Sequence, residues 1–269
     1  MGVVNITPDS FHDGGRYDLP EKAIAHALEL VEQGADIIDI GGESTRPGAV
    51  PVSENDELVR VIPVLEGLVP QVSVPISIDT TKSRVAHVAL DTGASMINDV
   101  SALRQDPNMA DVIARSGAAV VLMHMQGTPR TMQQSPQYAD VGAEVLQFFE
   151  ERVAAALLAG IAQTNIILDP GFGFGKLLSH NLDLLRGLSS FMMLNCPLLV
   201  GLSRKGFIGS IVGKAVGRRE WGTAAAVALA VDRGAKIVRV HDVATMIDVV
   251  KMAAALSPLW ATDEQEHDA

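Results

Sequence analysis

Polar and charged residues follow nearly every apolar run in the sequence. The residues in these positions are Asn5, Asp79, Asn98, Asp169, Lys205, Arg239 and His241. Carboxylates accept paired hydrogen bonds, amides both donate and accept them, and cations bind anionic groups. Together these residue types are suited to binding a polar small molecule that carries an anionic part.

Three of these residues are cationic or can become so, and they follow two runs near the end of the chain. Lys205 closes the segment Gly-Leu-Ser-Arg-Lys at 201–205, and Arg239 precedes His241 by two positions. The chain as a whole has a net charge of −11, so the cluster indicates a local anion site. We expect Arg239 and His241 to hold an anionic group, and the amide oxygen of Asn5 to help bind Mg²⁺, which prefers oxygen ligands. A structural histidine is the alternative for His241.

Two segments rich in glycine and proline lie in the first fifth of the chain. The segment 5–15 leaves an apolar run through a proline and two glycines, and we interpret it as a mobile lid. The segment 41–48, Gly-Gly-Glu-Ser-Thr-Arg-Pro-Gly, carries Arg46 on a backbone that can approach a ligand closely. Arg46 is therefore a second candidate for binding an anion.

The segment 169–176, Asp-Pro-Gly-Phe-Gly-Phe-Gly-Lys, resembles two nucleotide-binding motifs but fits neither. A phosphate-binding loop requires Ser or Thr after the lysine, where this chain has Leu177, and a dinucleotide fingerprint requires GxGxxG spacing. ATP and NAD are thus disfavoured as ligands. We interpret the segment as a flexible loop whose Phe172 and Phe174 close over a flat ring. Packing of both phenylalanines on the rim of the fold is the alternative.

Other polar residues have simpler interpretations. We expect Asp99, Ser44, Ser101 and Asp242 to form loops or cap helices. The histidines other than His241 lack the spacing of a zinc site, and we read them as structural.

The elements that position these residues follow a regular alternation. The pair Gly-Ala precedes a short apolar run at 34–35, 93–94, 117–118 and 234–235, as expected where a glycine ends a helix and a buried strand begins. We predict strands near 1–5, 36–41, 74–79, 94–98, 118–123, 166–169, 198–202 and 236–240. Amphipathic helices are predicted at 20–33, 54–69, 81–91, 107–116, 140–159, 220–233 and 243–256. This α/β pattern predicts a (β/α)₈ TIM barrel over 1–258 with the active site at the C-terminal ends of the strands, followed by a short acidic tail at 259–269. A doubly wound open sheet is the alternative.

The composition agrees with a globular enzyme. Hydrophobic residues make up 48% of the chain and aromatic residues only 4%, a balance typical of buried parallel strands. The acidic net charge excludes general binding to nucleic acid or to anionic membranes. Cys196 is the single cysteine, which excludes a disulfide framework, and the chain contains no apolar run long enough for a membrane span. We expect a cytoplasmic protein. The helix around 223–231 is apolar nearly all round, which predicts burial in the core or at a subunit interface.

The motifs taken together resemble those of one family. MGVVNITPDSF, GGESTRPGA, SIDT, IND, MHMQGTP, DPGFGFGK, GLSRKGFIG and RVHDV, in this order, are similar to the motifs of dihydropteroate synthases over residues 1 to about 255. The resemblance implies a transferase of folate biosynthesis. It would condense 6-hydroxymethyl-7,8-dihydropterin pyrophosphate with p-aminobenzoate, yielding 7,8-dihydropteroate and pyrophosphate, with Mg²⁺ as cofactor and a homodimer as the assembly.

The resemblance also implies roles for single residues. The pterin would be bound by Asp79, Asn98, Met123, Asp169, Lys205 and Arg239. The pyrophosphate and p-aminobenzoate would be bound by Asn5, Thr45, Arg46, Pro47, Phe11, Phe174, Gly206, Arg239 and His241. The residues assigned to catalysis would be Lys205, Arg239, His241, Asp13 and Arg46, and Asn5 would be the metal ligand.

One position departs from the family pattern. Several relatives have Ser after the Ser-Arg-Lys motif, where it contacts the p-aminobenzoate carboxylate, and this chain has Gly206. We expect backbone N–H groups of the following helix to bind that carboxylate instead. A pterin-binding methyltransferase domain and a noncatalytic pterin-binding paralogue are the alternative functions. The Thr45-Arg46-Pro47 segment argues against the first, and the intact polar set argues against the second.

Overall fold

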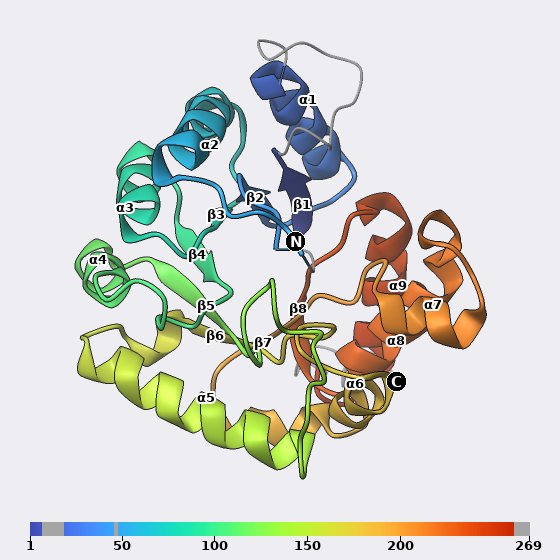
Figure 1. The fold of residues 1–269 in the computed structure, drawn as a ribbon. Helices are drawn as coiled ribbons and strands as arrows, with labels where there is room; N and C mark the ends of the chain where they lie inside the picture. The colour runs from blue at the N-terminus through green and yellow to red at the C-terminus, as the bar shows by residue number, and fades with distance from the viewer. Residues whose placement is uncertain (7–18, 46–47, 261–269) are drawn as a thin grey trace, which may run out of the picture.

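The computed structural model describes residues 1–6, 19–45 and 48–260. Within these ranges, eight parallel strands form one sheet in sequence order. The strands are β1 Gly2–Asn5, β2 Ile38–Gly41, β3 Ile76–Asp79, β4 Met96–Asp99, β5 Ala119–Met123, β6 Ile166–Asp169, β7 Leu198–Val200 and β8 Ala235–Val238. The helices are α1 Leu19–Glu32, α2 Glu54–Leu68, α3 Ser83–Thr92, α4 Met109–Ser116, α5 Val141–Leu158, α6 Leu178–Arg186, α7 Gly206–Val212, α8 Glu220–Asp232 and α9 Val243–Leu256. Figure 1 shows the strands at the centre and the helices around them.

The two outer strands of the sheet are linked by backbone hydrogen bonds. Gly2 of β1 forms a parallel bridge with Val240, two residues beyond β8. Val3 N–H donates to the carbonyl of Val240 over 3.1 Å, and Val240 N–H donates to the carbonyl of Met1 over 2.9 Å. A doubly wound sheet reverses its strand order part-way, so the continuous order from β1 to β8 excludes that alternative.

The repeated Gly-Ala pairs end helices as the sequence predicts. Gly34, Gly93, Gly117 and Gly234 all have positive φ angles, between 70° and 122°. A side chain strains such a conformation, whereas glycine adopts it freely. The chain therefore turns at each of these glycines from a helix into β2, β4, β5 or β8.

Buried apolar side chains lie on both faces of the strands. Val120, Ile97 and Leu198 belong to the large cluster that contains the helix side chains. Their sequence neighbours Val121, Met96 and Leu199 belong to a separate, smaller cluster. Because successive side chains of a strand point to opposite faces, the first cluster lies between sheet and helices and the second lies on the inner face.

Two helices, α6 and α7, lie outside the ranges predicted from the sequence, although a helix after Gly206 was expected. Both are short, and α7, with the sequence GFIGSIV, contains two glycines, which are poor helix formers. Trp260, inside the predicted tail, packs against the core and lies under the ammonium of Lys236 at 3.7 Å. Of the helices in the described residues, none is both long and apolar enough to cross a membrane.

Candidate active site

The strand register brings the predicted polar residues to one end of the sheet. Asn5 pairs with Gly41, Gly41 with Asp79, and Asp79 with Asn98, across the ends of β1 to β4. Met123, at the end of β5, pairs with Asp169 at the end of β6 in the same way. Residues far apart in sequence thus become neighbours because parallel strands end at a common edge.

Arg239 connects two carboxylates at this end. Its Nε donates to Asp39 Oδ2 over 2.6 Å, and its Nη2 donates to Asp79 Oδ2 over 3.2 Å. Asn98 Nδ2 also donates to Asp39 Oδ2, over 3.3 Å. Burial raises the pKa of Asp79 to about 8, against the opposing effect of Arg239. The guanidinium is therefore held in a fixed orientation by acids from two neighbouring strands.

Asp169 and Lys205 are buried groups of opposite charge whose electrostatic effects reach each other. Burial raises the pKa of Asp169 and lowers that of Lys205 to about 8. The Lys205 charge opposes the rise at Asp169, and the Asp169 charge opposes the fall at Lys205. Gly171 N–H donates to Asp169 Oδ1 over 2.8 Å and fixes the carboxylate. The Lys205 ammonium lies 4.2 Å from the centre of the Phe174 ring. A carboxylate, an ammonium and an aromatic ring thus lie together.

The loop after β6 differs from its predicted form. Phe172 is only 1% exposed and belongs to the core, so only Phe174, which is half-buried, is placed to contact a ligand. The loop backbone is extensively bonded: Gly173 N–H donates to Asn181, and the carbonyl of Gly173 accepts from Gln133. The interpretation that both phenylalanines close over a ring is therefore wrong for Phe172, which packs in the core.

His241 lies beside the loop after β7. Its Nδ1 is 3.1 Å from Ser203 Oγ, which also accepts from the His241 backbone N–H over 3.3 Å. Burial lowers the pKa of His241 to about 4, and the nearby charges of Arg204 and Arg239 add to this effect. The imidazole is therefore neutral at neutral pH. It can donate a hydrogen bond or take up a proton when an anion lies next to it.

Three further predicted residues surround the same region. The amide oxygen of Asn5 and the carboxylate of Asp79 both lie within 4 Å of the space that a side chain at Gly41 would fill. Thr45 lines a cavity of about 250 Å³ together with Asp79. Gly206 begins α7, and apart from its chain neighbours and its own helix no atom of the described residues lies within 4 Å of the position a Cβ would take there.

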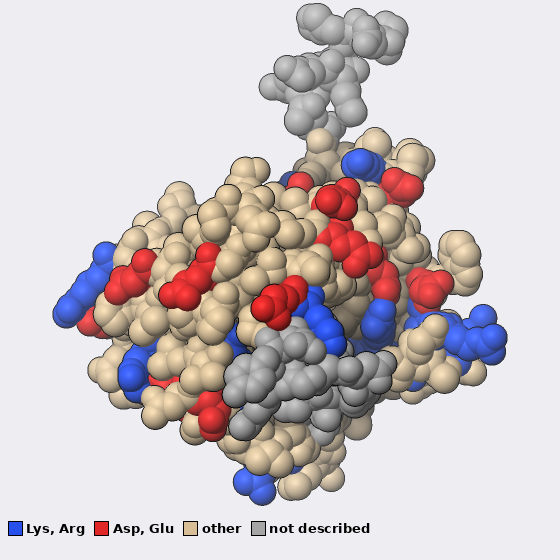
Figure 2. Space-filling view, turned by 90° about the horizontal axis from the view of Figure 1, so that it is seen from above, with Lys and Arg blue, Asp and Glu red and all other residues tan. Residues whose placement is uncertain are grey.

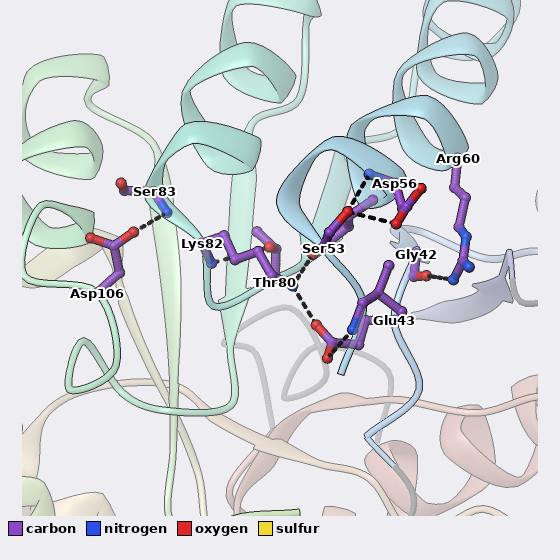
Figure 3. Close-up of polar contacts among 11 residues, drawn as sticks. Gly42, Glu43, Ser53, Asp56, Arg60, Thr80, Lys82, Ser83 and Asp106 are labelled. Atoms are coloured by element: carbon purple, nitrogen blue, oxygen red, sulfur yellow. Dashed lines mark hydrogen bonds and ion pairs between the residues drawn. The ribbon is translucent and has the colours of Figure 1, made fainter. Parts of the chain in front are cut away.

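The start of the second glycine-rich segment is anchored by charged groups. The Lys82 ammonium contacts the carboxylates of Glu43 and Glu57, and Glu57 is fully buried. Glu43 also accepts from the backbone of Val52 over 3.1 Å, and Arg60 donates to the carbonyl of Gly42 over 2.8 Å. Figure 3 shows how these contacts join the loop after β2 to α2 and to the residues before α3. The anchor fixes the backbone that leads to Thr45.

The remaining predictions divide into two groups. Asp99 accepts from the N–H groups of Ser101 and Leu103, both over 2.8 Å, which confirms its role as a loop former. Asp242 forms an ion pair with Arg204 and links the loops after β7 and β8. The other group lies outside the described residues and comprises Phe11, Asp13, Arg46 and Pro47.

The sequence interpretation missed Asp39 and the contact between His124 and Lys176. Asp39 is fully buried and binds Arg239, and its Oδ1 has no hydrogen-bond partner among the described residues. An acidic residue in the apolar run DIIDI, two positions before a strand end, could have indicated it. Lys176 Nζ lies 2.9 Å from His124 Nδ1 in a buried contact. The lysine that follows the glycines of DPGFGFGK could have indicated this contact.

The surface agrees with the acidic composition. On the face seen in Figure 2, acidic and basic side chains are interspersed, and the basic ones form no continuous surface. The positive groups described above instead gather at the strand ends. This arrangement, on an α/β fold of parallel strands, is that of an enzyme for a polar, partly anionic small molecule.

Comparisons with known proteins identify the kind of enzyme. The family described as pterin binding enzyme matches residues 1–241. Dihydropteroate synthase of Escherichia coli strain K12 is 47% identical over 95% of this chain and 90% of the relative, and that of Synechocystis is 48% identical over 95% and 89%. The solved structure of Xanthomonas albilineans dihydropteroate synthase with 4-aminobenzoic acid has a TM-score of 0.90 at 50% identity, covering 95% of this chain and 92% of that one. The chain therefore belongs to the pterin-binding enzymes and, among them, to the dihydropteroate synthase family.

Proposed function

We propose that this protein is a working dihydropteroate synthase of folate biosynthesis and that the strand-end residues are its active site. It joins the amino group of p-aminobenzoate to the methylene carbon of 6-hydroxymethyl-7,8-dihydropterin pyrophosphate and releases pyrophosphate. One observation carries the assignment of the site: Asp79, Asn98, Asp169 and Arg239, from four strands or strand ends, meet at one edge of the sheet. We further propose that the sheet closes as a (β/α)₈ barrel with this edge as its active face.

The pterin would be held by hydrogen bonds along its edge. Its ring N–H groups suit the carboxylates of Asp79 and Asp169, while Asn98 and Lys205 donate to ring nitrogen and carbonyl oxygen. Met123, buried at the end of β5, supplies apolar contact, and the guanidinium of Arg239 would pack on the ring face. The fixed orientation of Arg239 and Asp169 supports this arrangement, because a prepared site loses less entropy on binding.

The pyrophosphate would lie between Asn5, Arg239 and His241. Mg²⁺ commonly takes only one or two protein oxygens and completes its shell with phosphate and water, so the Asn5 amide oxygen beside Asp79 is a fitting donor. A bound Mg²⁺ would offset part of the pyrophosphate charge. His241, neutral in the free protein, would donate to a phosphate oxygen and gain a proton as negative charge develops.

The residues present suit a reaction that needs no nucleophilic side chain. When pyrophosphate departs, positive charge develops on a methylene conjugated with the pterin ring, and the amine attacks that carbon. The principal catalytic contribution is then electrostatic support of the leaving group by Arg239 and His241. Lys205 would steady the ring through its contact with the pterin edge.

The amine would bind between the second loop and the loop after β6. Phe174 and Lys205, which contact each other, would form one wall, Thr45 would form part of the other, and Gly206 would leave space for the carboxylate. The family resemblance adds Phe11, Asp13, Arg46 and Pro47 to this pocket, with Asp13 and Arg46 also assigned to catalysis. The two substrates would thus share Lys205 and otherwise use separate groups of residues.

We also propose a homodimer. Exposed apolar side chains lie on α7 and α8, which pack against each other: Ile211, Trp221 and Leu229, with Trp221 78% exposed. Burial of such side chains against a second copy would remove them from water. The cytoplasmic location stays a prediction from the sequence.

The test is formation of 7,8-dihydropteroate from both substrates and Mg²⁺, followed by mass spectrometry. Wild type should form product only with p-aminobenzoate present. Asp169→Asn should lose pterin binding, whereas Asp183→Asn, at an exposed ion pair on α6, should bind and turn over normally. Arg46→Ala should retain pterin binding and lose use of the amine. Equal loss of pterin binding in Asp169→Asn and Arg46→Ala would refute this division of roles.

A further inference from the structure

Lys176, the last residue of the segment 169–176, has no role in the reaction described above. It is buried, with 3% exposure, at the start of the link to α6. Its Nζ lies 2.9 Å from His124 Nδ1, 3.0 Å from the carbonyl oxygen of Gly171 and 3.0 Å from that of Phe174. The carbonyl oxygen of His124 is a fourth neighbour at 3.3 Å.

The three nearest partners of Lys176 Nζ match the hydrogen-bonding capacity of its amino group. Carbonyl oxygens only accept hydrogen bonds, and a neutral imidazole accepts at the nitrogen that carries no proton. An ammonium has three N–H groups for the three shortest contacts, whereas a neutral amine has two. Burial lowers the pKa of Lys176 to about 7, and burial together with the Lys176 charge lowers that of His124 to about 2. The three contacts are satisfied either by an ammonium that donates to a neutral histidine or by a neutral amine that accepts from His124 Nδ1–H and donates to both carbonyls.

The carbonyl groups that Lys176 binds belong to peptides next to two residues of the proposed site. Gly171 accepts from Lys176 through its oxygen and donates through its N–H to Asp169 Oδ1 over 2.8 Å. Phe174 accepts from Lys176 through its carbonyl, and its ring contacts the Lys205 ammonium. The buried Lys176 Nζ thus connects the carboxylate proposed to bind the pterin with the aromatic wall of the proposed amine pocket.

His124, the partner of Lys176, is itself held in place. It directly follows β5, its backbone N–H donates to the carbonyl of Asp169 over 2.9 Å, and its ring packs edge-on against Phe148 at 4.8 Å. The loop after β6 also approaches this backbone closely: a Cβ at Gly171 would lie 2.0 Å from the carbonyl oxygen of His124. The loop is therefore clamped between strand β5 and the lysine.

We propose that Lys176 is a positioning residue for the reaction, which sets the loop 171–174 so that Asp169 and Phe174 are presented together to the two substrates. The inference rests on the proposed function and deepens it. Lys176 contacts neither substrate in this account and acts through the Gly171 and Phe174 peptides.

The test compares Lys176→Met, which keeps the length of the stem and removes the charge, with Lys176→Gln, whose amide keeps two N–H donors. Lys236→Met, at the lysine over Trp260, is the control for loss of a lysine remote from the site. The measurements are KM for p-aminobenzoate, kcat, and the dissociation constant of dihydropterin pyrophosphate.

Loss of the buried hydrogen bonds that Lys176 Nζ forms is large enough to change an equilibrium by about 10-fold. We expect Lys176→Met to raise KM for p-aminobenzoate and the pterin dissociation constant by about 10-fold, with a smaller rise in Lys176→Gln. A purely structural role would lower the amount of active enzyme and leave KM unchanged in the folded fraction.

Unchanged KM and pterin affinity in folded Lys176→Met would overturn the inference. Failure of both Lys176→Met and Lys176→Gln to fold would overturn it as well. The wild type and Lys236→Met report separately on the proposed function. If those two form no product, the synthase assignment fails. If they are active and Lys176→Met matches them, only the positioning role fails.

Discussion

Alanine substitutions at Gly171 and Gly117 together separate two energetic costs: that of a side chain on a left-handed backbone and that of a steric collision. Gly171 has φ +67°, and a Cβ there would lie 2.0 Å from the backbone oxygen of His124. Gly117, at the end of α4, has φ +70°, but within the part of the chain that the structure describes, no atom beyond its chain neighbours lies within 4 Å of its Cβ position. Gly117→Ala therefore reports the cost of the left-handed backbone alone, and Gly171→Ala reports that cost plus the collision.

The magnitudes follow from general values. A side chain in the left-handed region costs about 1–2 kcal/mol, partly offset by about 0.4–1 kcal/mol because alanine restricts the unfolded chain. Gly117→Ala should thus lower the free energy of unfolding by about 1 kcal/mol. The collision at Gly171 adds a typical overpacking cost of about 1–3 kcal/mol, since a backbone atom must move. The two variants should differ by that added amount.

Urea unfolding followed by circular dichroism, at matched protein concentration, measures this difference. Activity provides a second readout, because displacement of the Gly171 N–H removes the hydrogen bond that orients Asp169. Gly171→Ala should lose pterin binding and Gly117→Ala should retain it. Equal stability and equal pterin affinity in the two variants would refute the claim that this loop is clamped against β5.

Three further outcomes are expected. Gly206→Ser should lower KM for p-aminobenzoate about 2- to 10-fold, because the position has room for a hydroxyl that can donate a hydrogen bond. Steady-state kinetics measures this change, and a higher KM would contradict the proposed geometry. Bound pyrophosphate should raise the pKa of His241 from about 4. Pyrophosphate should therefore bind more tightly as pH falls from about 7 to about 5, and its binding should take up protons from the solution. Calorimetry in two buffers should show this uptake in wild type and less of it in His241→Gln; equal uptake would exclude His241. Trp221→Glu should convert a dimer to a monomer in light scattering, and an unchanged mass would place the interface elsewhere.

The fold could be predicted largely because its signals are local. Each Gly-Ala pair combines a residue that tolerates positive φ with the first residues of a buried strand, and four such pairs fixed the spacing of half the strands. The short helix α7 carries no comparable signal. Two glycines lower its intrinsic preference, so its helical form depends on contacts such as those of Phe207 and Ile208 with the core.

The site could be predicted where a residue ends a strand, and less well where its partner lies elsewhere. Asp79 and Asp169 follow from strand position alone. Asp39 lies inside a strand, and only the folded chain brings Arg239, 200 positions away in sequence, within 2.6 Å of it. The sequence of the loop after β6 could not indicate which of its two phenylalanines is buried. Its path depends on positive φ at Gly171, Gly173 and Gly175 and on the contact with Lys176, which joins it to His124 after β5.

Pyrophosphate release tests the account most directly. Wild type should release pyrophosphate from dihydropterin pyrophosphate in the presence of p-aminobenzoate and Mg²⁺, in step with the amine consumed. Asp169→Asn, confirmed as folded by circular dichroism, should release none under the same conditions. Release by wild type that does not depend on the amine, or full release by Asp169→Asn, would contradict the claim that the strand-end residues form the active site of a dihydropteroate synthase.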